Sequence, residues 1–172
     1  KGGNAVSFLM EHEHYSYPEA IRYLAKKYNI EIEETEQSDE QKQQADERES
    51  MFLVSEFARD YFQRILVEDN EGKAIGLSYF KERGFTDETI EKFQLGYALN
   101  NWDAFSSEAI NKGYNLKYLE STGLTIVKQD LLAPNGVKQF DRFKGRVLFP
   151  IHSMSGRVLG FGGRILTNDK KA

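Results

Sequence analysis

Residues 48–68 carry apolar side chains at the spacing of one helical face, and this run constrains the fold more than any other segment. Spacing of i, i+3, i+4 and i+7 is typical of an amphipathic helix docked on a core. The apolar positions are Met51, Val54, Phe57, Ala58, Tyr61, Ile65 and Leu66. The rest of the 172-residue chain must supply that core, and a chain of this length buries roughly 70% of its unfolded surface without a disulfide or metal staple.

Shorter helices are expected after this run. Residues 73–83 form one that ends at Gly84, because glycine adopts the left-handed conformation of a helix C-terminus at no steric cost. Thr86 can cap the next helix through its hydroxyl group. Gly113 and Gly123 are placed to end two more. Together these elements predict a small helical layer.

The chain divides before the long helix. Residues 1–33 predict two short helices, with a break near Pro18, which suits a first helical turn. Residues 34–47 are rich in Gln and Glu and contain Ala45 as their only aliphatic side chain. Such a segment cannot offset its ordering entropy by burial, which predicts a flexible acidic linker. The remaining residues, 48–172, would form the main domain.

The residues after Leu124 are of the types that favour β-strands. Residues 125–127 are β-branched, and residues 145–166 alternate around a Ser-Met-Ser-Gly turn, which predicts a β-hairpin. Pro150 cannot donate to a ladder, so its strand should lie at an edge or carry a bulge. Glycines at 160, 162 and 163 predict a bulge or a close approach by another part of the chain. The fold class is therefore α+β, with helices first and an antiparallel sheet last.

Composition excludes several classes of protein. The sequence has no apolar run near the roughly 20 residues of a membrane span. It has no cysteine, which excludes a disulfide framework, a zinc-thiolate site and a cysteine nucleophile within this chain. The first residues lack the pattern of a signal peptide, so an intracellular compartment is expected.

The net charge of −4 conceals a gradient. Residues 33–49 carry eight acids and two bases, whereas residues 138–172 carry eight bases and two acids. If Arg142, Lys144 and Arg146 lie on one strand, alternation places all three on one face. That row suits the phosphates of an extended nucleic-acid strand. A solvated strand face is the alternative interpretation.

Other motifs have structural explanations. The glycine-rich segment does not fit a dinucleotide site, because Ile165 occupies the position of the third glycine. His12 and His14 would point to different helix faces, so we expect solvated side chains rather than a metal site. We interpret His152 as a turn residue and Trp102 as a packing anchor, with base stacking as the alternative for Trp102. No catalytic and no metal-binding residue is predicted.

Two segments of the hairpin carry a family resemblance. The runs FKGRVLFPI at 143–151 and GRVLGFGGR at 156–164 closely resemble the RNA polymerase core of bacterial DnaG-type DNA primases. Residues 79–85 and 93–98 resemble the helical part of that core. Residues 1–33 resemble the end of the zinc-binding domain of the same family.

The resemblance implies a function for the longer parent protein. Enzymes of this family make short RNA primers on single-stranded DNA at the bacterial replication fork, in the cytoplasm. They combine a zinc domain, a polymerase core with a Toprim fold and a helicase-binding tail. By resemblance, the parent would use zinc and magnesium or manganese, and would meet the template strand and the replicative helicase. This chain would hold neither the zinc ligands nor the catalytic metal site, and alone it would be inactive.

The resemblance also implies a template groove. Arg83, Arg142, Arg146 and Arg164 match basic positions that the family presents to single-stranded DNA, and Lys144 stands where many relatives have arginine. Lysine keeps the charge but loses the bidentate fork. Two alternatives remain open: a non-catalytic strand-binding or partner-docking module, and an enzyme that acts on a nucleotide cofactor.

Overall fold

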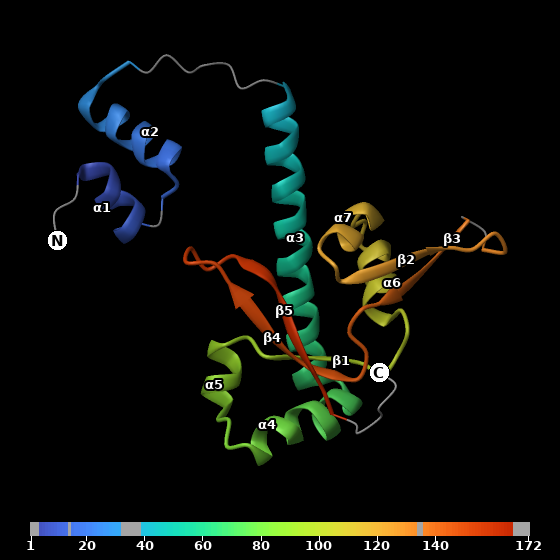
Figure 1. The fold of residues 1–172 in the computed structure, drawn as a ribbon. Helices are drawn as coiled ribbons and strands as arrows, with labels where there is room; N and C mark the ends of the chain where they lie inside the picture. The colour runs from blue at the N-terminus through green and yellow to red at the C-terminus, as the bar shows by residue number, and fades with distance from the viewer. Residues whose placement is uncertain (1–3, 14, 32–38, 134–135, 167–172) are drawn as a thin grey trace. The chain divides into compact units, whose positions relative to one another are not determined.

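The computed structural model describes residues 4–13, 15–31, 39–133 and 136–166 (Figure 1). The chain forms two compact units, Lys1–Gln44 and Ala45–Ala172.

The first unit contains two short helices, α1 (Ala5–His12) and α2 (Tyr17–Tyr28). The side chain of Asn4 accepts a hydrogen bond from the Ser7 amide at the start of α1. Ser16 and Glu19 form a capping box at the start of α2, which satisfies backbone donors that the helix leaves free. Both predicted helices and the break between them are confirmed.

Helix α3 (Asp39–Glu68) is longer than predicted. It begins at Asp39 rather than at residue 48, because most residues of the added turns are Glu, Gln, Lys and Ala, which favour helix. Residues 39–47 of the predicted linker are therefore helical, and residues 34–38 lie outside the described part of the chain. The division into three parts stays a prediction. The later turns of α3 bury one face in the core: Val54, Ala58, Tyr61, Phe62, Ile65 and Leu66.

The predicted helix at 73–83 begins with a π-helical turn. The elements are η1 (Gly72–Leu77) and α4 (Ser78–Glu82). A Cβ atom at Gly72 would lie 1.9 Å from the carbonyl oxygen of Ile65, so a side chain at this position would clash with the end of α3.

The remaining helices follow the predicted signals. They are α5 (Asp87–Lys92), α6 (Ala104–Asn111) and α7 (Leu116–Ser121). The Thr86 hydroxyl accepts a hydrogen bond from the Thr89 amide at the start of α5. Gly113 and Gly123 follow α6 and α7 with positive φ angles of 90° and 72°. The predicted caps are confirmed.

Two antiparallel sheets complete the second unit. The first has the order β1 (Gly96–Ala98), β4 (Arg146–His152), β5 (Val158–Ile165), and the second pairs β2 (Thr125–Gln129) with β3 (Val137–Asp141). The β4–β5 hairpin and the β2 strand were predicted. Strand β1 is too short to show alternation. The apolar residues of β3 are three positions apart and do not alternate. For these reasons neither strand was predicted. The α+β class is confirmed, with helices first and antiparallel strands last except for β1, which precedes α6 and α7.

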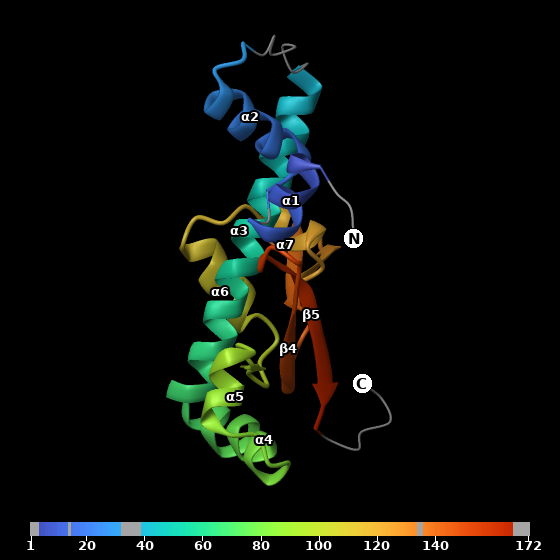
Figure 2. The ribbon, with the colours of Figure 1, turned by 90° about the vertical axis from the view of Figure 1, so that its left-hand side faces the viewer.

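Helices cover both faces of the three-stranded sheet. On one face, the ring of Phe161 in β5 meets Phe62 of α3, with 5.7 Å between centroids. On the other face, Phe149 of β4 meets Phe80 of α4 at 5.6 Å. Figures 1 and 2 both show α3 running beside the β4–β5 hairpin. The sheet therefore forms the middle layer of the core.

Pro150 and the strand glycines match their predictions in part. The pairing of β1 with β4 ends at Leu148, and a register irregularity follows at Ile151, so Pro150 costs no hydrogen bond to β1. A Cβ atom at Gly163 would lie 2.6 Å from the ring of Phe143, which confirms a close approach there. A Cβ atom at Gly160 would meet open space, but the register irregularity lies beside this glycine, because Ile151 pairs with Gly160 and His152 pairs with Val158.

Candidate nucleic-acid interface

The predicted row of three cations on one strand is wrong. Strand β3 ends at Asp141 and β4 begins at Arg146, so Arg142 and Lys144 lie on the loop between them. Gly145 interrupts the chain with a φ of +57°, and its amide donates to the carbonyl of Leu99. A strand cannot pass through this left-handed residue, so alternation does not align the three side chains.

A buried carboxylate holds this loop in place. Asp141 accepts hydrogen bonds from the amides of Phe105 and Ser106, at 2.8 and 2.9 Å, and so caps α6 from a neighbouring strand. Asp103 is the N-cap residue by position, yet its side chain caps no backbone amide of α6. Burial raises the pKa of the Asp141 carboxyl, and the hydrogen bonds act in the opposite direction.

The same residue fixes the segment before α6. The backbone amide of Asp141 donates to the carbonyl of Trp102 at 2.6 Å. Asp141 therefore joins three parts of the site: the start of α6, the Trp102 segment and the loop that carries Arg142 and Lys144. Sequence reasoning gave this residue no role.

Trp102 is the centre of an exposed group of aromatic rings and cations. Its side chain is 63% exposed, so its interpretation as a packing anchor is wrong. The core position at this helix start belongs instead to Phe105, which is 1% exposed. The ammonium of Lys144 lies 3.8 Å from the centroid of the indole ring, and Phe140 meets the indole edge-on at 6.1 Å.

Two further lysines join this group. The ammonium groups of Lys128 and Lys138 lie 5.9 and 5.4 Å from the centroid of the Phe140 ring. We call the whole set the Trp102 cluster: Trp102, Phe140, Lys128, Lys138 and Lys144. An open hollow of about 590 Å³ lies beside it, lined by Trp102, Asp103 and residues 137–140 of β3. The sequence analysis missed Lys128, Lys138 and Phe140.

Arg146 and Arg164 lie at the end of the sheet. Arg146 pairs with Ile165, and Arg164 pairs with Val147, so side-chain alternation sends the two guanidinium groups to opposite faces. Neither side chain has a hydrogen-bond or ion-pair partner among the residues that the structure describes. A strand that contacts both would have to cross the end of the sheet.

The other two predicted cations have intramolecular contacts. The guanidinium of Arg83 lies 3.7 Å from the centroid of the Tyr79 ring, and it is exposed at the end of α4. The Nε of Arg142 donates to the carbonyl of Gly123. These contacts orient both side chains and leave their charges without a carboxylate partner in the described part of the chain.

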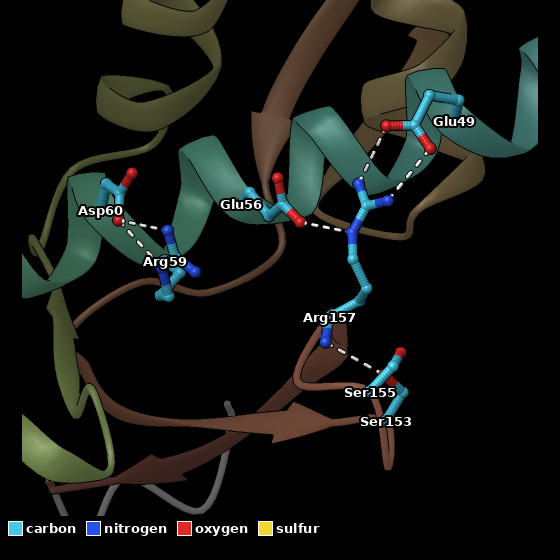
Figure 3. A network of polar contacts seen from close by, with 7 residues as sticks. All are labelled: Glu49, Glu56, Arg59, Asp60, Ser153, Ser155 and Arg157. Carbon is cyan, nitrogen blue, oxygen red and sulfur yellow. Dashed lines mark hydrogen bonds and ion pairs between the residues drawn. The ribbon is translucent and has the colours of Figure 1, made fainter. Parts of the chain in front are cut away.

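Arg157 shows the opposite behaviour (Figure 3). Its guanidinium donates two hydrogen bonds of 3.0 Å to Glu49 and one of 2.6 Å to Glu56, both on α3. It also lies 4.4 Å from the centroid of the Phe52 ring. The hydrogen bonds from Arg157 lower the pKa of Glu49. This cation is neutralised within the fold and is not available to a ligand.

The curated proteins most like this chain include several bacterial DNA primases. The DNA primase of Halalkalibacterium halodurans is 39% identical over 169 residues, which is 98% of this chain and 27% of that protein. The DNA primase of Deinococcus radiodurans is 37% identical over 98% of this chain and 26% of that protein. The chain therefore spans about a quarter of the length of these relatives.

Solved structures show the same likeness. The RNA polymerase domain of the Mycobacterium tuberculosis primase DnaG has a TM-score of 0.62 and 30% identity, covering 73% of this chain and 38% of that one. A DnaG primase catalytic domain bound to single-stranded DNA has a TM-score of 0.63 and 29% identity, covering 74% and 38%. The zinc-binding and RNA polymerase domains of the Aquifex aeolicus primase have a TM-score of 0.59 and 28% identity, covering 100% and 38%.

Residues 1–40 match the family model described as the CHC2 zinc finger. The residues present do not fit a zinc site. The sequence has no cysteine, and the described residues contain no group of three or more His, Asp or Glu side chains able to hold a metal ion. His12 pairs with Glu13, His152 with Gln94, and His14 lies outside the described residues.

A second family model covers most of the chain. Residues 61–172 match the model described as the N-terminal domain of the DNA primase catalytic core. This range contains α4 to α7, both sheets, the Trp102 cluster, and Arg146 and Arg164 at the sheet end. The family model, the identities above 30% and the shared fold agree, and the chain therefore belongs to the DnaG-type DNA primase family.

Proposed function

We propose that this chain supplies part of the single-stranded DNA template groove of a bacterial primase, a longer enzyme that synthesises RNA primers at the replication fork. One observation carries the proposal. Lys144, on the loop that precedes Arg146, lies over the ring of the exposed Trp102, and Arg146 itself has no polar partner in the described part of the chain. A relative of the same fold is bound to single-stranded DNA.

The Trp102 site has the two features that single-strand binding requires. Nucleobases stack on exposed aromatic rings, and each stacked base contributes roughly 1 to 3 kcal/mol. Lys144 can stay beside the indole as a cation–π partner or turn to a neighbouring phosphate. Trp102 would thus hold a base, and Lys144 a phosphate.

The remaining predicted cations would neutralise the backbone of the strand. Arg146 and Arg164 would contact phosphates on either side of the sheet end, with Arg142 and Arg83 farther along. Phosphate contacts position a strand without reading its sequence. This groove would therefore bind templates with little sequence preference.

Primer synthesis would need residues beyond those described here. Phosphoryl transfer by metal ions requires clustered carboxylates on a rigid core, and the described residues contain no such group. We infer that magnesium or manganese, zinc and the replicative helicase all bind other parts of the parent protein, which would work in the bacterial cytoplasm. Among the described residues, no helix is long and apolar enough to cross a bilayer.

Salt dependence of DNA binding tests the groove. For single strands, the logarithmic slope of affinity against salt is roughly −0.7 per neutralised phosphate. Replacing both Arg146 and Arg164 by alanine should reduce the size of that slope by about 1.4. The control replaces Lys26 and Lys27, two exposed residues of α2. If the control loses as much slope as the groove variant, attraction is diffuse and the groove is refuted.

A primer-synthesis assay tests the predicted inactivity. A homogeneous preparation of this chain, given template, ribonucleotides and either Mg²⁺ or Mn²⁺, should make no primer. Any metal-dependent primer would refute that inference. Stoichiometric binding of a nucleotide without DNA would instead support the alternative of a nucleotide-cofactor enzyme.

A further inference from the structure

Two lysines face each other across the β2–β3 hairpin, and no described carboxylate pairs with either of them. Lys128 and Lys138 are direct partners in the register of these antiparallel strands. Both are exposed, and neither forms an ion pair within the described part of the chain. Like charges directly opposite each other destabilise a strand pair. Both ammonium groups contact the Phe140 ring, but no carboxylate in the described part of the chain pairs with either of them, and a bound anion would offset the repulsion.

The face that carries this pair is continuous with Trp102. Alternation along the strands places Lys128 and Lys138 on the same face as Phe140, which agrees with their contacts to its ring. Phe140 in turn touches Trp102 edge-on. The Lys128–Lys138 pair is therefore linked, through one aromatic ring, to the proposed base-stacking site.

We propose that the Lys128–Lys138 pair is a phosphate-binding subsite for the same single strand, so that the β2–β3 hairpin extends the template track beyond Trp102. The inference rests on the proposed function, because it requires a strand at Trp102. A nucleic-acid strand fits this face better than an acidic peptide does. It offers consecutive phosphates to the two ammonium groups and bases to the adjoining rings.

Oligonucleotide length separates this subsite from the rest of the groove. A thymidine trinucleotide is short enough to occupy the Trp102 site alone, whereas a 12-mer can also reach the hairpin. In the Lys128→Gln, Lys138→Gln variant, the salt slope for the 12-mer should fall by about 1.4, the value for two phosphates. The slope for the trinucleotide should stay as in the wild type. The Lys128→Arg, Lys138→Arg variant should keep the slope for the 12-mer.

The controls make each outcome decisive. A variant with Lys26 and Lys27 replaced by glutamine should bind both oligonucleotides as the wild type does. An unchanged slope for the 12-mer in the Lys128→Gln, Lys138→Gln variant overturns the subsite and leaves the proposed function intact. Failure of the wild type to bind either oligonucleotide overturns both. Polyglutamate binding that loses the same slope in this variant would assign the pair to an acidic protein, against the proposal.

Thermal unfolding checks that the variant is folded. Removing two opposed charges should leave the midpoint of the Lys128→Gln, Lys138→Gln variant equal to or above that of the wild type in low salt, and the difference should shrink in high salt. A lower midpoint in low salt would show that the two lysines stabilise the fold. That result would contradict a repulsion between them that a bound anion relieves.

Discussion

The two ends of the β4–β5 hairpin differ in whether their arginine side chains pair with carboxylates. At the turn end, Arg157 is held by Glu49 and Glu56 of α3. At the open end, Arg146 and Arg164 have no partner among the described side chains. At the turn end, the positive charge of Arg157 is met by two carboxylates within the fold. Under the proposed function, the charges at the open end bind the template strand.

This difference shows what a count of basic residues conceals. The charge gradient along the sequence counts every arginine of the hairpin equally. In the structure, some of these arginines have carboxylate partners and others have none among the described residues. Two carboxylates pair with Arg157, whereas no described carboxylate pairs with Arg146, which agrees with the proposal that Arg146 binds the template strand. Substitutions at each end, and at the residue that holds the open end in place, separate these two kinds of arginine.

Asp141→Ala should have the largest effect on stability. It leaves the amides of Phe105 and Ser106 without their acceptor, and unsatisfied buried donors of this kind cost about 3 kcal/mol together. Urea unfolding measures the loss. Asp103→Ala is the matched control, because that carboxylate is exposed and caps no backbone amide. Equal losses in the two variants would show that the buried carboxylate has no special role.

Arg157→Ala should cost less stability and no DNA affinity. The three hydrogen bonds to Glu49 and Glu56 are partly exposed, so the loss should be about 1 kcal/mol. Because Arg157 is already neutralised, the salt slope for single-stranded DNA should match that of the wild type. A smaller slope in this variant would place Arg157 in the groove and erase the difference between the two ends.

Arg146→Ala should show the reverse pattern. The unfolding free energy should change little, because the side chain has no polar partner to lose within the described structure. The salt slope for single-stranded DNA should fall by about 0.7, the value for one phosphate. Titrations at several salt concentrations, with Arg157→Ala in parallel, measure both quantities. A loss of stability without a change in slope would show that Arg146 stabilises the fold and does not contact the DNA.

The smallest effect concerns pH. The pKa of Glu49 is lowered in the folded state by its hydrogen bonds to Arg157, so its ionised form stabilises the fold. That contribution is present above the unfolded pKa of about 4.3 and is lost as pH falls through the folded pKa. Glu49→Gln should therefore lower stability by a few tenths of a kcal/mol at pH 7. Urea unfolding at pH 7 and pH 3 should show the difference closing in acid, and a persistent difference would contradict the ion pair.

Much of the fold could be predicted from local sequence signals. The amphipathic spacing of 48–68, the cap at Thr86 and the glycines at 113 and 123 each act within one element, and the structure confirms them. Strands β1 and β3 could not be predicted, because each is stabilised by pairing with a distant or adjacent strand rather than by its own pattern.

The site was less predictable because its geometry depends on contacts between elements. Nothing local shows that Asp141 caps α6 or that Lys144 lies on Trp102. One signal was present in the sequence. The tripeptide Val-Lys-Gln occurs at 127–129 and again at 137–139, around an Asn-Gly pair. If the two copies pair antiparallel about the seven residues between them, Lys128 lies opposite Lys138, as the register shows.

The emission of Trp102 offers the most direct measurement, because it is the only tryptophan in the chain. Single-stranded DNA should be titrated in low salt while Trp102 emission and the anisotropy of a labelled oligonucleotide are recorded together. Stacking of a base on the ring predicts a change in emission that saturates at the same DNA concentration as the anisotropy. If the oligonucleotide binds while the emission of Trp102 stays constant, the strand lies elsewhere, and the open end of the hairpin is not the template site.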